Sequence, residues 1–197
     1  MKTKLLILSA VLFLVAVVAA EAQIKKYDIK SGIITFQNDM TMGTMKMQTK
    51  AIVYFDDYGM KECKETYTGD KLSTSTFSDG KDLYIVHHKE KIAMKQGPAY
   101  RGTEVRMDKS EFGSKKDWDE GKIKEAQAMT VAGKTCEVIV TDDGKGTKAT
   151  YGGWEKILLY LDVQTNTVRT NMHAVKVEEN AKVPADKFQV PAGYKIQ

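Results

Sequence analysis

The stretch of sequence from Gly32 to Phe55, GIITFQNDMTMGTMKMQTKAIVYF, predicts a β-hairpin. Gly43 and Thr44 stand at its centre, and a two-residue turn there would pair the segments on either side. Because side chains alternate between the two faces of a strand, this register gathers one group of apolar side chains on one face. That face carries Ile34, Phe36, Met40, Met42, Met45, Met47, Val53 and Phe55. The other face is mostly polar, so the hairpin should have one apolar face and one face exposed to solvent.

Short runs rich in Tyr, Val, Ile, Thr and Phe follow one another along the rest of the chain. Turn signals such as Ser78-Asp79-Gly80 separate them, which is typical of successive antiparallel strands. We expect strands near residues 25–41, 46–55, 60–68, 72–78, 82–88, 91–95, 135–141, 147–152, 156–163 and 167–178. The pattern predicts a mainly β protein of the α+β class, built on a single antiparallel sheet.

The stretch from residue 96 to 128 breaks this rhythm. Ser114 followed three residues later by Asp117 is a capping pattern, so a helix can begin there. Gly121 interrupts the segment and its apolar stripe is thin, which favours a loop or short helix that covers the sheet.

The closing segment, residues 183–194, contains two prolines, which cannot donate to a sheet ladder. It should therefore lie at an edge of the sheet or outside it. We expect Phe188 and Tyr194 to pack back on the sheet.

The N-terminus has the features of a signal peptide. Lys2 and Lys4 precede an apolar run, and Ala20-Glu21-Ala22 fits a cleavage site. We therefore expect residues 1–22 to be removed and residues 23–197 to form one domain. The run is short for a membrane span, so the sequence favours a periplasmic or secreted protein with no stable membrane anchor.

Charge and motifs exclude several function classes. The net charge is only +4 and the basic residues are almost all lysine, which argues against nucleic acid as a partner. The sequence contains no nucleophile elbow, zinc-helix signature or phosphate loop. His87 and His88 are adjacent on an expected strand and should face opposite sides. We therefore expect no enzyme activity, no cofactor and no site for a metal built on histidine.

Cys63 and Cys136 are the two cysteines of the chain. Export to an oxidising compartment would allow a disulfide between them if their Cα atoms lie within about 7 Å. The alternative is two buried thiols with no chemical role.

Several segments resemble an uncharacterised family of exported bacterial proteins related to the outer-membrane lipoprotein carriers and lipoprotein-sorting (LolA-like) proteins. The resemblance covers nearly all of the expected mature chain. It is carried by residues 32–66, with YFDDYG at 54–59, and by VAGKTC at 131–136, WEKIL at 154–158 and FQVPAGY at 188–194. It implies a strongly curved antiparallel sheet that forms an unclosed barrel with a helix or loops over its concave side. In the carriers that side shelters lipoprotein acyl chains.

The methionine-rich hairpin fits such a ligand. An unbranched thioether adapts to irregular apolar partners. We therefore expect the apolar face of the hairpin, which runs from Ile34 through the four methionines to Phe55, to line the ligand-binding site. The sequence thus predicts a binding or carrier protein for a lipid or lipoprotein acyl chain, with a handover partner in the envelope. Two alternatives stay open. One is a structural or interaction protein that fills its own core, and the other is Cu(I) binding through Met40, Met42, Met45 and Met47.

Overall fold

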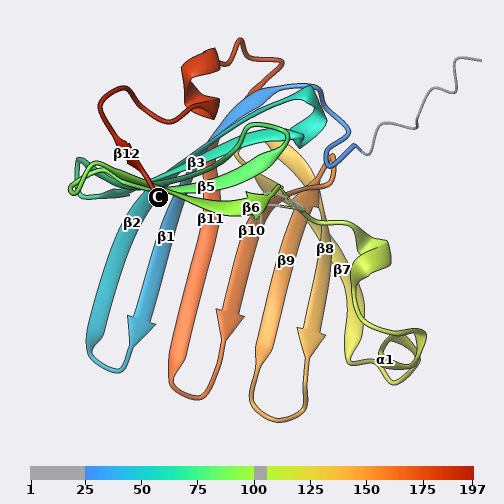
Figure 1. Ribbon diagram of the computed structural model, residues 1–197. Helices are drawn as coiled ribbons and strands as arrows, with labels where there is room; N and C mark the ends of the chain where they lie inside the picture. The colour runs from blue at the N-terminus through green and yellow to red at the C-terminus, as the bar shows by residue number, and fades with distance from the viewer. Residues whose placement is uncertain (1–24, 100–105) are drawn as a thin grey trace, which may run out of the picture.

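The computed structural model describes residues 25–99 and 106–197, and most of these residues lie in strands (Figure 1). The predicted signal peptide, residues 1–22, lies outside the described residues. The strands are β1 (Gly32–Met42), β2 (Met45–Asp56), β3 (Lys61–Thr68), β4 (Lys71–Ser78), β5 (Asp82–His87), β6 (Ile92–Pro98), β7 (Ile123–Val131), β8 (Lys134–Asp142), β9 (Lys148–Trp154), β10 (Ile157–Gln164), β11 (Val168–Glu179) and β12 (Lys195–Ile196). The helical elements are η1 (Asp57–Gly59), η2 (Lys109–Glu111), α1 (Lys115–Asp119) and η3 (Ala185–Phe188). No helix among the described residues has the length and apolar character needed to traverse a bilayer.

All the strands belong to one 12-stranded sheet in the order β12-β6-β5-β4-β3-β2-β1-β11-β10-β9-β8-β7. Neighbouring strands are antiparallel, except that β12 runs parallel to β6. The sheet curls, so that β3–β6 lie across the upper ends of the long central strands in Figure 1. Its two edge strands, β12 and β7, do not pair with each other, and the barrel stays open. The predicted unclosed barrel is therefore confirmed.

The predicted hairpin register is also confirmed. Met42 lies opposite Met45, and Met40 lies opposite Met47. The same alignment continues through Phe36–Ala51 and Ile34–Val53 to the far end of the strands. Gly43 adopts a φ of +58°, the conformation that a tight hairpin turn requires and that glycine takes without steric cost.

The structure corrects the predicted strands at two places, one directly before this hairpin and one at an edge of the sheet. Residues 25–31, expected as part of the first strand, are not in a strand: residues 26–30 form bends, and β1 begins only at Gly32. Residues 123–128, expected in a loop or helix, belong instead to the edge strand β7, which pairs with β8. The short helix α1 does begin with the predicted capping box between Ser114 and Asp117. Pairing with β8 thus overrides the helical preference of the lysine, glutamate and alanine residues that β7 contains.

Apolar side chains form two separate clusters. The larger one gathers residues such as Ile34, Phe55 and Ile157 with Tyr27 from the N-terminal segment. The smaller one lies on the outer face of β3–β6, where Phe188 and Tyr194 of the closing segment pack against the sheet. The predicted docking of the closing segment is confirmed.

Of the two possibilities that the sequence left open for the cysteines, the structure contains the free thiols. Cys63 lies in the smaller cluster and Cys136 in the larger one, and both thiols are free and buried. The alternative of two buried thiols holds. Burial raises the pKa of the Cys63 thiol to about 12, so it carries almost no thiolate at neutral pH.

We therefore expect neither cysteine to react with a thiol reagent such as iodoacetamide in the folded protein. After unfolding in urea without reductant, both should be alkylated, as intact mass spectrometry would show. A protein that gains no alkyl group even when unfolded would contain the disulfide and contradict this arrangement.

Candidate functional site

The predicted lining divides into two groups along the hairpin. Ile34, Phe36, Val53 and Phe55 expose at most 1% of their surface and belong to the larger core. The methionines at the turn end of the same face are open, with exposed fractions of 38% for Met40, 49% for Met42, 60% for Met45 and 49% for Met47. Only this second group can touch a ligand without opening the core. We call these four residues the methionine patch.

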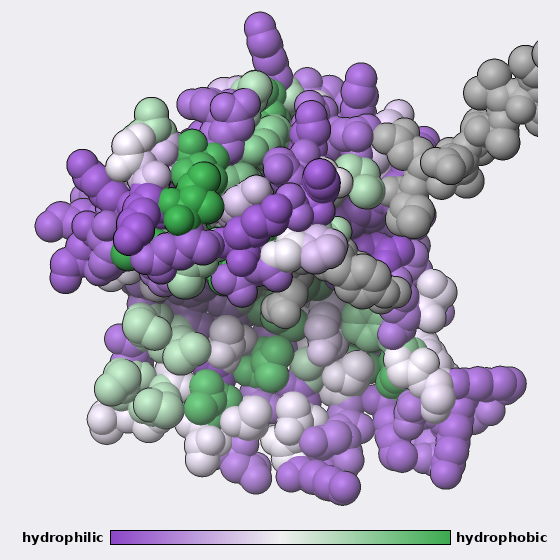
Figure 2. Space-filling view, viewed as in Figure 1, coloured by the Kyte–Doolittle hydropathy of each residue, from purple (hydrophilic) through white to green (hydrophobic). Residues whose placement is uncertain are grey.

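The methionine patch continues across the neighbouring strands of the concave face. On β11, Thr170 lies opposite Met40 and Val168 lies opposite Met42. Met172 follows on the same face, and β10 adds Leu161 and Val163 beside it. These side chains are half-buried. Figure 2 shows apolar side chains gathered over the lower ends of these strands, with the surface hollowed beneath the overhanging layer of β3–β6.

The sequence prediction missed the contribution of β10 and β11. Alternating apolar residues in 157–163 and 168–174 signal one apolar face for each strand. That local signal does not say which strands become neighbours. Pairing of β1 with β11, far away in sequence, is what brings Met172 and Leu161 to the hairpin.

Exposed methionines in one group are costly to leave in water. Burying one methionine side chain stabilises a protein or complex by roughly 1.5–3 kcal/mol. Apolar residues that are exposed singly are common, but a contiguous exposed patch indicates a binding surface. Met40, Met42, Met45 and Met47 account for most of the large apolar side chains that are exposed among the described residues. Their unbranched thioethers can follow the shape of a flexible apolar chain.

Two segments cover other parts of the concave face and seal the core there. Tyr27 packs edge-on against Phe55 with a centroid distance of 4.9 Å, and Phe112 packs in the same way against Tyr151 at 4.8 Å. Met107 is also buried in this core. The methionine patch therefore marks the end of the face that these segments leave open.

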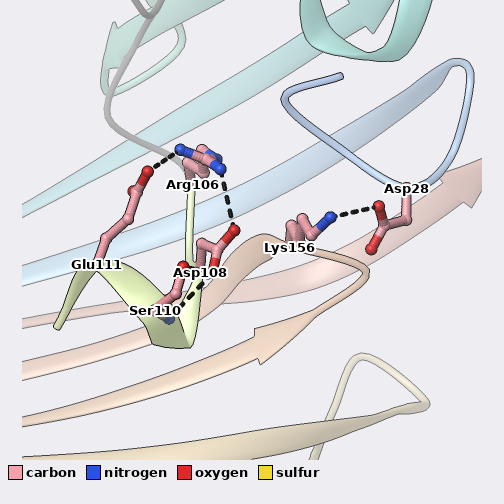
Figure 3. Close-up of polar contacts among 6 residues, drawn as sticks. All are labelled: Asp28, Arg106, Asp108, Ser110, Glu111 and Lys156. Carbon is pink, nitrogen blue, oxygen red and sulfur yellow. Dashed lines mark hydrogen bonds and ion pairs between the residues drawn. The ribbon is translucent and has the colours of Figure 1, made fainter. Parts of the chain in front are cut away.

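A network of charges holds the covering segments in place (Figure 3). Arg106 donates to Glu111 and, at 3.0 Å, to Asp108, while Lys156 donates to Asp28 at 2.9 Å. Hydrogen bonds from the Ser110 hydroxyl and backbone lower the pKa of the Asp108 carboxyl. A cleft of about 420 Å³ borders these residues, but its lysine and aspartate side chains are already paired. We interpret the network as structural.

A second cavity, of about 540 Å³, lies on the outer face under the closing segment. His88 joins the Ser75 hydroxyl at 2.7 Å and the Tyr194 hydroxyl at 3.0 Å, and Lys187 pairs with Glu65 at 2.5 Å. Burial lowers the pKa of His88. A serine and a histidine in contact invite comparison with a catalytic triad, but the third group is a tyrosine rather than a carboxylate. These bonds tie the closing segment to the sheet.

Within the described residues, no group of His, Cys, Asp and Glu could hold a metal ion. His87 and His88 lie on opposite faces of the sheet, as predicted, since His87 pairs with Thr74 and His88 contacts Ser75. A Cu(I) ion at the methionine patch would have thioether ligands alone.

Comparisons with known proteins find a similar fold but no sequence relative. No family model matches the chain, and no curated protein matches it. An uncharacterized conserved protein from Thermus thermophilus superposes with a TM-score of 0.56 at 9% identity, covering 91% of this chain and 98% of that one. MucB gives a TM-score of 0.51 at 12% identity, covering 87% of this chain and 61% of MucB. MucB in complex with MucA(peri) gives a TM-score of 0.50 at 10% identity, covering 85% of this chain and 56% of that one.

A LolA superfamily protein from Nitrosomonas europaea is also among the similar structures, with a TM-score of 0.43 at 8% identity over 86% of this chain and 97% of that one. At these identities the likeness to all four structures is one of fold.

Proposed function

We propose that this protein is a non-catalytic binding protein of the bacterial envelope, periplasmic or secreted, which holds an acyl chain of a lipid or lipoprotein against its concave face. The observation that carries this proposal is the exposed methionine patch, which continues into half-buried Met172 and Leu161 on the neighbouring strands. The sequence resemblance to the lipoprotein carriers points to the same class of ligand. A partner in the envelope would receive or deliver the chain.

A charge placed in the methionine patch should weaken binding without unfolding the protein. Met45 is the most exposed of the patch residues, at 60%. For Met45→Asp we expect at least about tenfold weaker binding of a fluorescent fatty acid, because a carboxylate on the apolar wall must be desolvated by the chain. Unfolding free energy should change by less than about 0.5 kcal/mol, as is usual at exposed positions. Fluorescence titration and urea denaturation measure the two effects.

Thr41→Asp is the matched control. Thr41 neighbours the methionine patch along β1 but faces the other side of the hairpin, opposite Lys46. The Thr41→Asp substitution adds the same charge to the same hairpin and should leave the affinity for the fluorescent fatty acid unchanged. If Met45→Asp instead lost stability and binding together, Met45 would be a core residue and the proposed site would be wrong.

A second candidate function is that of an interaction protein. The edge strand β7 pairs on its outer side with no strand of the described residues, and its residues 124–128 are exposed. An unpaired edge can accept a strand from another chain. MucB, whose fold is similar, forms a complex with MucA(peri). An interaction protein of this kind requires no ligand on the concave face, whereas the proposed acyl-chain-binding protein does.

A further inference from the structure

Lys64 on β3 stands apart from the other lysines that the structure shields from solvent. Among the described residues, the remaining buried or half-buried lysines each pair with a carboxylate: Lys26 with Glu62, Lys134 with Glu179, Lys156 with Asp28 and Lys187 with Glu65. Lys64 is half-buried as well, and it forms no ion pair with any described residue. A shielded ammonium without a partner is costly, because burial removes part of its hydration.

The position of Lys64 places it on the same concave face as the methionine patch. It lies opposite Val53 on β2 and opposite Thr76 on β4. Thr66 and Thr74, which face each other across β3 and β4, follow on the same face. The side-chain hydroxyls of these threonines make no hydrogen bond to another described residue. One cation and three hydroxyl groups therefore lie on this face without a hydrogen-bond partner among residues 25–99 and 106–197.

Glu62 stands two residues before Lys64 on the same face of β3 and is fully buried. Burial raises the pKa of the Glu62 carboxyl and the Lys64 charge helps to lower it, but the two side chains form no ion pair. The Oε2 atom of Glu62 accepts from the Lys26 ammonium at 2.5 Å and from the Tyr27 hydroxyl at 2.6 Å, while Oε1 has no hydrogen-bond partner among the described residues. Along β1, β2, β10 and β11, the side chains that border the open part of the face are apolar or neutral. Within the part of the chain that the structure describes, Lys64 therefore has no ion-pair partner that would compete with an anionic ligand.

On the basis of the proposed function, we infer that the ligand is an acyl amphiphile whose headgroup is anionic, either a carboxylate or a phosphate. Lys64 and the hydroxyls of Thr66, Thr74 and Thr76 bind the headgroup. The chain extends from the headgroup to the methionine patch, where it contacts the exposed methionine side chains. Val53, opposite Lys64, is six residues from Met47, and at a rise of about 3.3 Å per residue the two ends of this path lie about 20 Å apart.

Isothermal titration of the mature protein with chains of equal length tests this inference. The probes are dodecanoate, its neutral counterpart monododecanoylglycerol, and inorganic phosphate. We expect dodecanoate to bind at least about tenfold more tightly than monododecanoylglycerol, and phosphate alone to bind at least a hundredfold more weakly than dodecanoate, because it lacks the chain. In Lys64→Gln the affinity for dodecanoate should fall about tenfold, the usual scale for a lost charge-assisted hydrogen bond. Its affinity for the neutral glyceride should stay within twofold, which also reports that the variant is folded.

Two further variants complete the test. Lys64→Arg keeps the charge and should retain the preference for dodecanoate. Lys61→Gln removes a lysine from the opposite face of the same strand and should change neither affinity. Equal binding of the charged and neutral chains, unaffected by Lys64→Gln, would overturn the headgroup assignment while the proposed function stands. Phosphate that binds as tightly as dodecanoate would also overturn it, since the site would then serve a free anion. Failure of every chain to bind would reject the proposed function and this inference together.

Discussion

Phe55→Ala should lower the free energy of unfolding by about 3–5 kcal/mol, the usual range for truncating a buried phenylalanine. Phe55 is fully buried and packs edge-on against Tyr27. Its ring also lies so close to Gly32 that a Cβ there would come within 2.6 Å of it. A tightly enclosed site of this kind collapses poorly after truncation, so the lost contacts and the cavity both contribute. Urea denaturation monitored by circular dichroism measures the loss.

Met45→Ala is the matched control, because Met45 lies on the same face of the same strand as Phe55. Met45 is 60% exposed, so its replacement by alanine should change the free energy of unfolding by less than about 0.5 kcal/mol. The contrast tests whether this apolar face really divides into a core half and an open half. Similar losses for both variants would show that the methionine patch is covered and is no ligand surface.

Glu62→Gln should destabilise the protein by about 3–5 kcal/mol, the cost of removing one partner from a buried ion pair. Glu62 is fully buried and Lys26 is 7% exposed. Burial raises the pKa of the Glu62 carboxyl, while the Lys26 ammonium and the Tyr27 hydroxyl oppose this by stabilising the carboxylate. The amide keeps the shape of the side chain but removes the negative charge that the Lys26 ammonium contacts. Urea denaturation again provides the measurement.

Two variants set the scale for this loss. Glu178→Gln breaks the exposed pair with Lys176 and should cost less than about 1 kcal/mol. The double variant Lys26→Met with Glu62→Gln should recover part of the stability, because it removes the buried charge as well. If Glu62→Gln were as mild as Glu178→Gln, the N-terminal segment would not be anchored to the sheet through Glu62.

The sequence predicted the hairpin well because its signals are local. Gly43 marks the turn, and the period of two then fixes every partner from Met42–Met45 outward. The pairing of β1 with β11 carries no such local mark. It also contains a register shift between Thr35 and Phe36, which alternation alone does not reveal. The part of the site on β10 and β11 was therefore missed.

Alternation also says which face a side chain takes, but not how deeply it is buried. Ile34 and Met40 share a face of β1, yet the first is fully buried and the second is 38% exposed. The difference arises from Tyr27 and Met107, which lie on segments that cover only one end of that face. Neither segment shows in its sequence where it docks. The prediction consequently grouped core and candidate ligand-binding residues together.

The central claim is that the open end of the concave face holds an apolar chain, and native mass spectrometry tests it most directly. The protein would be expressed from its full-length sequence and purified without detergent, and its mass would be compared before and after extraction with organic solvent. We predict a bound species of lipid mass that extraction removes and that is depleted in Met45→Asp but not in Thr41→Asp. A wild-type protein that carries no lipid and also fails to bind added fatty acid would contradict the claim.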